Sequence, residues 1–156
     1  LTKINKKMKY TLTIIKPDAV VAGYFPEILH RIQKDGKFRI AAMKMTALRK
    51  RQVENFYKMH KEKEFFQSVV DFMSSGPVVL AVLEKRNAVE DYRKFIGKTN
   101  PADAEKGTIR NLFGTNIQNN AVHGSDSDES AIREIHFFFG ANEIFDKQGN
   151  VIELHK

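Results

Sequence analysis

Apolar and polar positions follow two different periods in the first third of this chain. Between residues 10 and 15, apolar residues alternate with threonines, which is typical of a strand, and Pro17 ends the pattern. From Phe25 the apolar residues instead recur at helical spacing as far as Gly36, which is placed to cap the helix at its C-terminal end. A second strand is predicted over residues 38–46.

The middle of the chain predicts two short helices, a buried strand and a further helix. Helical spacing recurs around residues 53–60 and again over 66–73, where Gly76 and Pro77 follow. The unbroken apolar run 78–83 predicts a strand that is buried on both faces. Helical spacing then returns over 88–96.

The last third predicts a long loop, a short strand and a final helix. Residues 97–119 lack periodicity, and a loop of that length in a compact domain is usually functional or wrongly assigned. A short fourth strand is predicted at Ala121 and Val122. A helix should begin near Ser127, which can cap it, and should bury Ala131, Ile135 and Phe138 or Phe139.

This order of elements, β-α-β-β-α-β, predicts a ferredoxin-like α+β sandwich. Its four-stranded, mainly antiparallel sheet would be covered by helices on one side. Residues 9–156 would form a single domain, because 156 residues support one core. The basic residues 1–8 would be a native extension or a remnant of expression cloning.

Charge and composition limit the classes of partner and location. The formal charge of +7 and the isoelectric point near 9.6 favour anionic partners. Five of the lysines lie within the first sixteen residues, so this excess does not indicate a nucleic-acid groove. Neither a transmembrane stretch nor a secretory segment is predicted, and the absence of cysteine excludes disulfides and thiolate metal sites. A cytoplasmic location fits these features.

His123 is the first candidate for chemistry. Taken alone, a histidine is more often a structural side chain than a nucleophile. Here Gly124 and Ser125 permit a tight turn before a helix whose N-terminus favours a bound anion. If Glu134 on that helix reached one ring nitrogen, it would fix the tautomer and leave the other nitrogen free to attack. The spacing does not establish this contact, but the context favours His123 as a nucleophile.

Several cations are candidates for phosphate binding. Lys16 follows the first strand directly and would extend from the end of the sheet. Arg93 and Arg110 flank the region without periodicity, with Thr99 between them, and guanidinium groups suit phosphate oxygens. Each of these side chains alone is as readily a surface residue. The chain has no P-loop and no dinucleotide-binding glycine motif.

Phe65 is the candidate for base binding. It lies off the apolar stripe of its helix, so it is either a core residue for a neighbouring element or a platform for a nucleobase. No pair of histidines has the spacing of metal ligands, so a zinc site held by protein side chains is not predicted.

Two segments, Thr13–Asp18 and Asn120–Ser127, resemble the signature segments of bacterial-type nucleoside diphosphate kinases. The similarity runs from about Lys9 to Phe145. It implies an enzyme that passes the γ-phosphate of a nucleoside triphosphate to a nucleoside diphosphate through a phosphohistidine, by a ping-pong mechanism with broad base specificity. His123 would carry the phosphate.

The resemblance also implies roles for the other residues. Glu134 would orient the ring, Ser125 would lie beside it, and Tyr57 would stand near the transferred phosphate. The phosphate chain would be held by Lys16, Arg93, Thr99 and Arg110. Phe65 would stack on the base, while Lys16 and Asn120 would contact the ribose.

Further expectations come from the same resemblance. Mg²⁺ would be held mainly by the nucleotide phosphates, ATP would be the donor, and the protein would form a tetramer or hexamer. Two positions depart from the usual pattern of the family. Glu64 stands where a proline is usual, which would loosen the loop before Phe65. Leu112 stands where an aspartate is usual, which would change the hydrogen bonding near Arg110.

Two other hypotheses compete with this one. A binding or regulatory protein could have kept the fold and used its basic surface on nucleic acid, with a steep salt dependence. A ferredoxin-like module could have no nucleotide site at all. The presence of all the expected site residues ranks both below the kinase, so neither nucleic acid nor a membrane is an expected partner.

Overall fold

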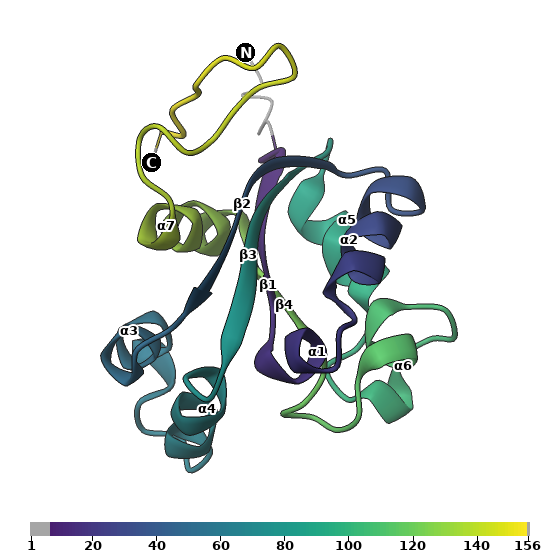
Figure 1. Ribbon diagram of the computed structural model, residues 1–156, viewed down its shortest axis with the longest axis vertical. Helices are drawn as coiled ribbons and strands as arrows, with labels where there is room; N and C mark the ends of the chain where they lie inside the picture. Colours follow the sequence, from purple (N-terminus) through teal and green to yellow (C-terminus); the bar gives the residue numbers. More distant parts are fainter. Residues whose placement is uncertain (1–6, 156) are drawn as a thin grey trace, which may run out of the picture.

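Four antiparallel strands form the centre of this computed structural model, which describes residues 7–155 (Figure 1). The order across the sheet is β2-β3-β1-β4, so β3 and β1 are central while β2 and β4 form the edges. The strands are β1 (Tyr10–Ile15), β2 (Arg39–Ala47), β3 (Pro77–Glu84) and β4 (Val122–Gly124).

Seven α-helices and two short 3-10 helices lie between and after these strands within the described residues. They are α1 (Pro17–Val21), α2 (Phe25–Lys34), α3 (Lys50–Phe56), η1 (Lys58–His60), α4 (Phe66–Met73), α5 (Ala88–Ile96), η2 (Pro101–Asp103), α6 (Ile109–Phe113) and α7 (Asp128–Phe138). The predicted ferredoxin-like arrangement is therefore confirmed, and each predicted strand and long helix is present.

Helices cover both faces of the sheet, so the prediction of helices on one side was wrong. Figure 1 shows α3, α4 and α7 on one side of the strands and α1, α2 and α5 on the other. Each side has its own buried cluster, one around Leu12 and Leu80 and the other around Ile15 and Ala81. The sheet is therefore the middle layer of three.

The two inner strands explain how both faces can be buried. All residues from Val78 to Leu83 are at most 2% exposed, which confirms the strand predicted to be buried on both sides. In β1 the second face carries threonines. Thr13 is accommodated there because its hydroxyl bonds the Tyr92 hydroxyl at 2.6 Å and donates to the carbonyl oxygen of His123 at 3.0 Å.

The local differences from the predicted elements are small. The 97–119 stretch is not wholly irregular, because η2 and α6 lie within it, and helices of three and five residues are too short to show a period. The C-cap of α2 is Asp35, and Gly36 follows it. A Cβ on Gly36 would lie 2.8 Å from the Ile32 carbonyl oxygen, so close approach of the backbone requires glycine there.

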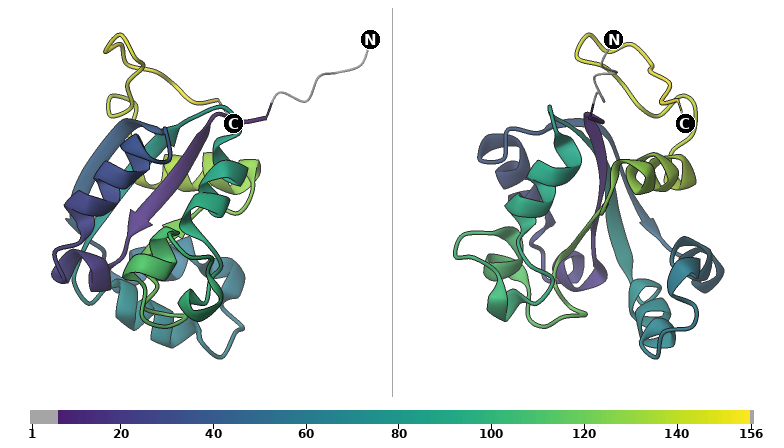
Figure 2. Two further views of the ribbon diagram at one scale, coloured as in Figure 1. Left: turned by 90° about the vertical axis from the view of Figure 1, so that its right-hand side faces the viewer. Right: turned by 180° about the vertical axis from the view of Figure 1, so that it is seen from behind.

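Both ends of the described chain lie at the same end of the molecule, as Figures 1 and 2 show. The predicted extension 1–8 falls mostly outside the described residues. Its last two members contact the domain: Lys7 pairs with Glu90 at 2.9 Å, and the Met8 amide donates to Asp128 at 3.1 Å. No helix within residues 7–155 is long and apolar enough to cross a membrane.

Candidate active site

One large cavity gathers the candidate residues that the sequence places far apart. Its volume is about 1270 Å³, which exceeds the usual size of a pocket for a small ligand. Nine of the ten predicted site residues line it: Lys16, Tyr57, Phe65, Arg93, Thr99, Arg110, Asn120, His123 and Glu134. The tenth, Ser125, is fully buried and reaches the site through Glu134.

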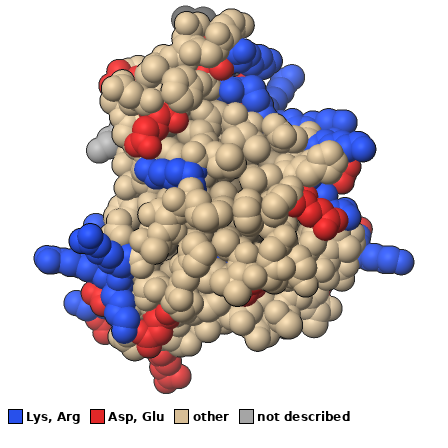
Figure 3. Space-filling view, viewed as in Figure 1, with Lys and Arg blue, Asp and Glu red and all other residues tan. Residues whose placement is uncertain are grey.

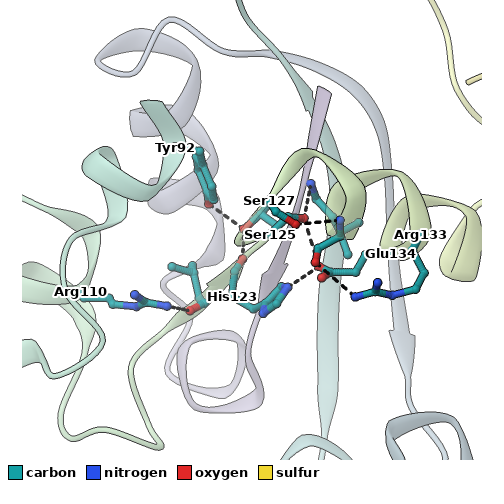
Figure 4. A network of polar contacts seen from close by, with 11 residues as sticks. Tyr92, Arg110, His123, Ser125, Ser127, Arg133 and Glu134 are labelled. Carbon is teal, nitrogen blue, oxygen red and sulfur yellow. Dashed lines mark hydrogen bonds and ion pairs between the residues drawn. The ribbon is translucent and has the colours of Figure 1, made fainter. Parts of the chain in front are cut away.

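His123 lies on β4 itself, opposite Ile14 in the antiparallel pair with β1. Because directly opposite side chains share a face, the imidazole extends to the side that α7 covers. There its Nε2 lies 2.6 Å from Oε1 of Glu134 (Figure 4). The contact that the sequence could only suggest is therefore present.

A second hydrogen bond fixes the carboxylate that holds the histidine. The Ser125 hydroxyl donates to the same oxygen, Oε1 of Glu134, at 3.0 Å. The Leu12 amide donates in turn to the Ser125 hydroxyl at 3.3 Å, which ties the group to β1. Since Glu134 occupies Nε2, the Nδ1 atom of His123 is the ring nitrogen left for a ligand in the cavity.

Aromatic side chains surround the imidazole. The ring centroids of Phe56 and Tyr57 lie 5.5 Å and 6.3 Å from that of His123, both edge to face. Burial is the main cause that raises the pKa of Tyr57, and the nearby Glu134 raises it further. The Tyr57 hydroxyl therefore keeps its proton at neutral pH and can donate a hydrogen bond into the cavity.

Lys16 is partly buried beside a polar partner at the end of β1. Its ammonium group donates to Oδ1 of Asn120 at 2.7 Å, and the Asn120 amide donates to the Thr99 carbonyl oxygen at 2.9 Å. Burial lowers the pKa of Lys16 to about 8, and the charge of Arg110 acts in the same direction. A bound phosphate would offset both effects by supplying the missing negative charge.

Arg110 is held from two sides by backbone carbonyl groups. Its Nη1 and Nη2 donate to Gly97 and Val122 at 2.9 Å and 3.0 Å. Within the described residues its buried Nε has no hydrogen-bond partner, so one donor remains unsatisfied beside the cavity. A buried donor without an acceptor is unfavourable, and a phosphate oxygen would satisfy it. Arg93, also in the cavity wall, is exposed.

Two apolar side chains extend into the open part of the cavity. Phe65 precedes α4 and is 53% exposed, with the ring of His60 at 6.1 Å. Ile117, which the sequence analysis did not single out, is 61% exposed and lines the same cavity. Its signal in the sequence was weak: an isolated apolar residue in a polar loop. Gln118, which lines the same cavity, accepts a hydrogen bond from the Ser68 hydroxyl on α4 at 2.6 Å.

Two details of the His123 segment differ from the prediction. The short strand is Val122–Gly124, not Ala121–Val122, because Ala121 has a φ of +72° and cannot continue a strand. Gly124 belongs to that strand and forms no turn. A Cβ there would lie 3.0 Å from the Tyr92 ring, so glycine allows β4 to pack closely against α5.

Comparison with known proteins decides the family. A sequence profile described as "Nucleoside diphosphate kinase" matches residues 9–144. The chain belongs to the nucleoside diphosphate kinase family. A member from Campylobacter jejuni subsp. doylei is 55% identical over 138 residues, which cover 88% of this chain and 100% of the relative. One from Chlamydia trachomatis serovar D is 53% identical over 137 residues, covering 88% and 96% respectively.

Solved structures agree with this assignment. The nucleoside diphosphate kinase of Aquifex aeolicus superposes with a TM-score of 0.84 at 46% identity and covers 87% of this chain and 98% of its own. That of Encephalitozoon cuniculi gives 0.83 at 34% identity, covering 87% and 92%. The chain is therefore an enzyme of nucleotide phosphate transfer, as the resemblance implied.

Proposed function

We propose that this nucleoside diphosphate kinase works by a two-step exchange through phosphorylated His123. In the first step Nδ1 attacks the γ-phosphorus of a nucleoside triphosphate. The bond from that phosphorus to the β,γ-bridging oxygen breaks, and the diphosphate leaves with the electron pair. In the second step a terminal oxygen of another diphosphate attacks the phosphohistidine, and the ring regains its lone pair.

The contact between His123 and Glu134 is the observation that supports this proposal most. A carboxylate 2.6 Å from Nε2 favours the tautomer with its proton on that nitrogen and stabilises positive charge that develops on the ring during attack. The other nitrogen is free for the reaction. A purely structural histidine would not require a cavity lined by cations beside its unbound nitrogen.

The charged residues of the cavity wall account for phosphate binding. Phosphoryl transfer depends mainly on positioning and on neutralising charge on the phosphate oxygens. Lys16, Arg93 and Arg110 supply three positive charges, and the Thr99 hydroxyl adds a neutral donor. Tyr57, beside the imidazole, would donate to the transferred phosphate. Asn120 would bind the ribose together with Lys16, which it already contacts.

Mg²⁺ fits this site as a companion of the nucleotide. Among the described residues, no three histidine or acidic side chains are grouped closely enough to hold a metal ion. Asp126 lines the cavity, and the Ser130 side chain beside it holds the pKa of its carboxyl below the ordinary range. This carboxylate would contact the hydration shell of an ion bound to the phosphates, which supplies neutralising charge for the transfer.

Broad base specificity follows from the nature of the outer cavity. Phe65 and Ile117 offer apolar surfaces, and stacking on such surfaces tolerates any base. With ATP as the common donor, the second substrate would be any nucleoside diphosphate. Lys16 and Asn120 would select for the sugar.

We further propose that the protein acts as a homo-oligomer in the cytoplasm. The edge strand β2 presents Met43 and Met45, which are 55% and 53% exposed. Exposed apolar edge strands invite pairing with another strand, so a second copy of this chain is the partner that fits this edge. Whether such pairs assemble into tetramers or hexamers is read from the mass in solution.

Intact mass spectrometry tests the proposed function. The wild-type chain is mixed with ATP and Mg²⁺, and then with GDP. One acid-labile phosphate should appear and then disappear as GTP forms. His123→Gln should fold but gain no phosphate, because glutamine has no nucleophilic ring nitrogen. His60→Gln is the matched control, since His60 lines the same cavity, and it should still be phosphorylated. Phosphorylation of His123→Gln would contradict the nucleophile assignment.

A further inference from the structure

The backbone immediately before β4 is strained. Ala121 is fully buried and has a φ of +72°, a region that side chains with a Cβ rarely adopt. The amide of Val122 donates to the carbonyl oxygen of Asn120 at 2.9 Å, which closes a three-residue turn around Ala121. Such a turn with positive φ is rare, and a strained residue persists only where its surroundings hold it.

The surroundings that hold Ala121 come from the segment after β1. The Ala121 amide donates to Oδ2 of Asp18 at 3.1 Å, and its carbonyl oxygen accepts from the Lys16 amide at 2.8 Å. Both polar groups of the strained residue are thus bound by one short segment. Of the two contacts, only that of Asp18 comes from a side chain, so only it depends on residue type.

Asp18 itself is in an unfavourable environment. Its second oxygen, Oδ1, is buried and has no partner among the described residues. Burial raises the pKa of this carboxyl, although the Ala121 amide opposes the shift. Among residues 7–155 this carboxylate forms no ion pair with a cation. The charge of Lys16 also lowers its pKa, but less than the hydrogen bond from the Ala121 amide does, so this hydrogen bond is its main polar contact.

The strained turn lies between the residue that contacts Lys16 and the residues that contact Arg110 and carry the imidazole. Before Ala121, the side-chain oxygen of Asn120 accepts a hydrogen bond from Lys16. After it, the carbonyl oxygen of Val122 accepts one from Arg110, and His123 is the next residue. Relaxation of Ala121 to a negative φ would rotate the peptide planes on both sides. Three groups would then move relative to Lys16: the side-chain amide of Asn120, the carbonyl oxygen of Val122 and the first residues of β4.

We propose that Asp18 is a positioning residue for phosphoryl transfer, which holds Ala121 in its strained turn and thereby sets Asn120 and His123 against Lys16. The proposal rests on the proposed function for its activity readout. It assigns Asp18 no contact with substrate. The carboxylate acts as a hydrogen-bond acceptor for one amide, and its charge is not required.

Four variants of the full chain test this role: Asp18→Ala, Asp18→Asn, Ala121→Gly and the double variant Asp18→Ala/Ala121→Gly. The readout is the rate at which His123 gains phosphate from ATP in the presence of Mg²⁺. This rate is measured by rapid quench followed by intact mass spectrometry. Asp18→Ala should lower this rate by about 5- to 150-fold. This factor corresponds to the free energy of strain of one residue in such a backbone conformation. Asp18→Asn keeps an acceptor oxygen and should stay within about threefold of wild type.

The Ala121→Gly background separates strain from other effects. Glycine adopts a positive φ without a steric penalty, so a glycine at position 121 depends less on the Asp18 carboxylate to keep the turn. The loss caused by Asp18→Ala should therefore shrink to about threefold or less in that background. An equal loss in both backgrounds overturns the proposal, and so does an Asp18→Asn variant as impaired as Asp18→Ala.

Folding provides a second readout. If Asp18→Ala does not fold, Ala121→Gly must restore folding, and failure of the double variant to fold overturns the proposal. A wild-type chain that gains no phosphate contradicts the proposed function instead. The coupling between residues 18 and 121 is then still measured from thermal unfolding of the wild type, Asp18→Ala, Ala121→Gly and the double variant, so the two failures are distinguishable.

Discussion

At the scale of single residues, burial and charge act in opposite directions on Lys16. Its pKa of about 8 lies well below the ordinary 10.5 because the ammonium group is buried near Arg110. In the free enzyme this group is charged only below about pH 8. Binding of nucleotide phosphates requires that charge, so kcat/KM should fall as the pH rises through about 8, and Lys16→Arg should shift or abolish this fall.

Stability should change in the opposite direction over the same range. Between about pH 8 and 10.5 the unfolded chain retains a proton on Lys16 that the folded chain has lost, so the free energy of unfolding contributed by this group rises with pH. The full effect is about 3 kcal/mol. Urea unfolding of wild type and Lys16→Met at pH 7 and 10 measures it, because the methionine variant lacks this dependence. Parallel pH curves for the two proteins would refute it.

The contacts of the site differ in how far the sequence predicts them. His123 and Lys16 lie in the two segments that resemble a family, and Glu134 was predicted from its place on the helix that follows His123. The structure brings all three to one cavity. Chain spacing alone could not show that Glu134 reaches Nε2, since the residues lie on a strand and a helix. The carbonyl partners of Arg110 were not predictable, because backbone acceptors carry no sequence signal.

At the scale of elements, period and length decide what the sequence reveals. The helices of eight or more residues and all four strands were predicted within a few positions. The five-residue helices α1 and α6 were missed, since less than two turns cannot establish a period. The prediction of helices on one side came from the order of elements, which does not determine how many faces of the sheet are covered. The threonines of β1 give no sign of the second layer, although Thr11 and Thr13 are both fully buried against the α5 side.

The close approach of β4 and α5 gives a prediction at this scale. An alanine Cβ at Gly124 would lie 3.0 Å from Cδ2 of Tyr92 and 3.1 Å from Cδ1 of Ile96. Both neighbours are buried, so β4 must shift, and Gly124→Ala should destabilise the fold by about 1–3 kcal/mol. The strand shift would also displace His123 and slow its phosphorylation. Urea unfolding and the rate of phosphate gain measure the two effects.

Gly76→Ala is the matched control for this substitution. The nearest atoms to its added Cβ would lie at 3.7 Å and 3.8 Å, which is ordinary van der Waals contact. Its effect on stability should stay within about 0.5 kcal/mol. Equal stability of the Gly124→Ala and Gly76→Ala proteins would show that β4 tolerates the extra carbon.

At the scale of the whole molecule, positive charge is distributed and does not form one track. Figure 3 shows lysine and arginine side chains gathered at the lower left of this face, where Figure 1 places α3, and along the upper right edge. Most of the surface between them carries no charge. The composition gives the formal net charge of +7 but not the distribution of the charged side chains over the surface. A continuous basic groove for a nucleic acid is therefore absent from the face shown.

The segment after the family match has its own place in the fold. Residues 145–155 turn back on themselves, with Phe145 paired to Val151. Ile152 and Leu154 pack, as Met8 does, against the buried cluster around Leu12 and Leu80. The Phe145 amide donates to Ala41 on β2 at 2.9 Å. Figure 1 places this segment at the end of the sheet opposite α4 and α6, whose residues line the cavity. It therefore covers the core and one part of the β2 edge without contacting the site.

Deletion of residues 146–156 should consequently separate stability from activity. Loss of two partly buried apolar side chains should lower the free energy of unfolding by about 2–4 kcal/mol, since each contributes part of the transfer free energy of a buried leucine or isoleucine. Phosphorylation of His123 at 25 °C should remain within about twofold of wild type, because the Glu134 and Ser125 contacts are untouched. Ile152→Ser/Leu154→Ser is the control that keeps the chain length, and it should reproduce most of the lost stability. If the deletion abolished phosphorylation in folded protein, the segment would have to act on the cavity through the sheet, and the separation argued here would be wrong.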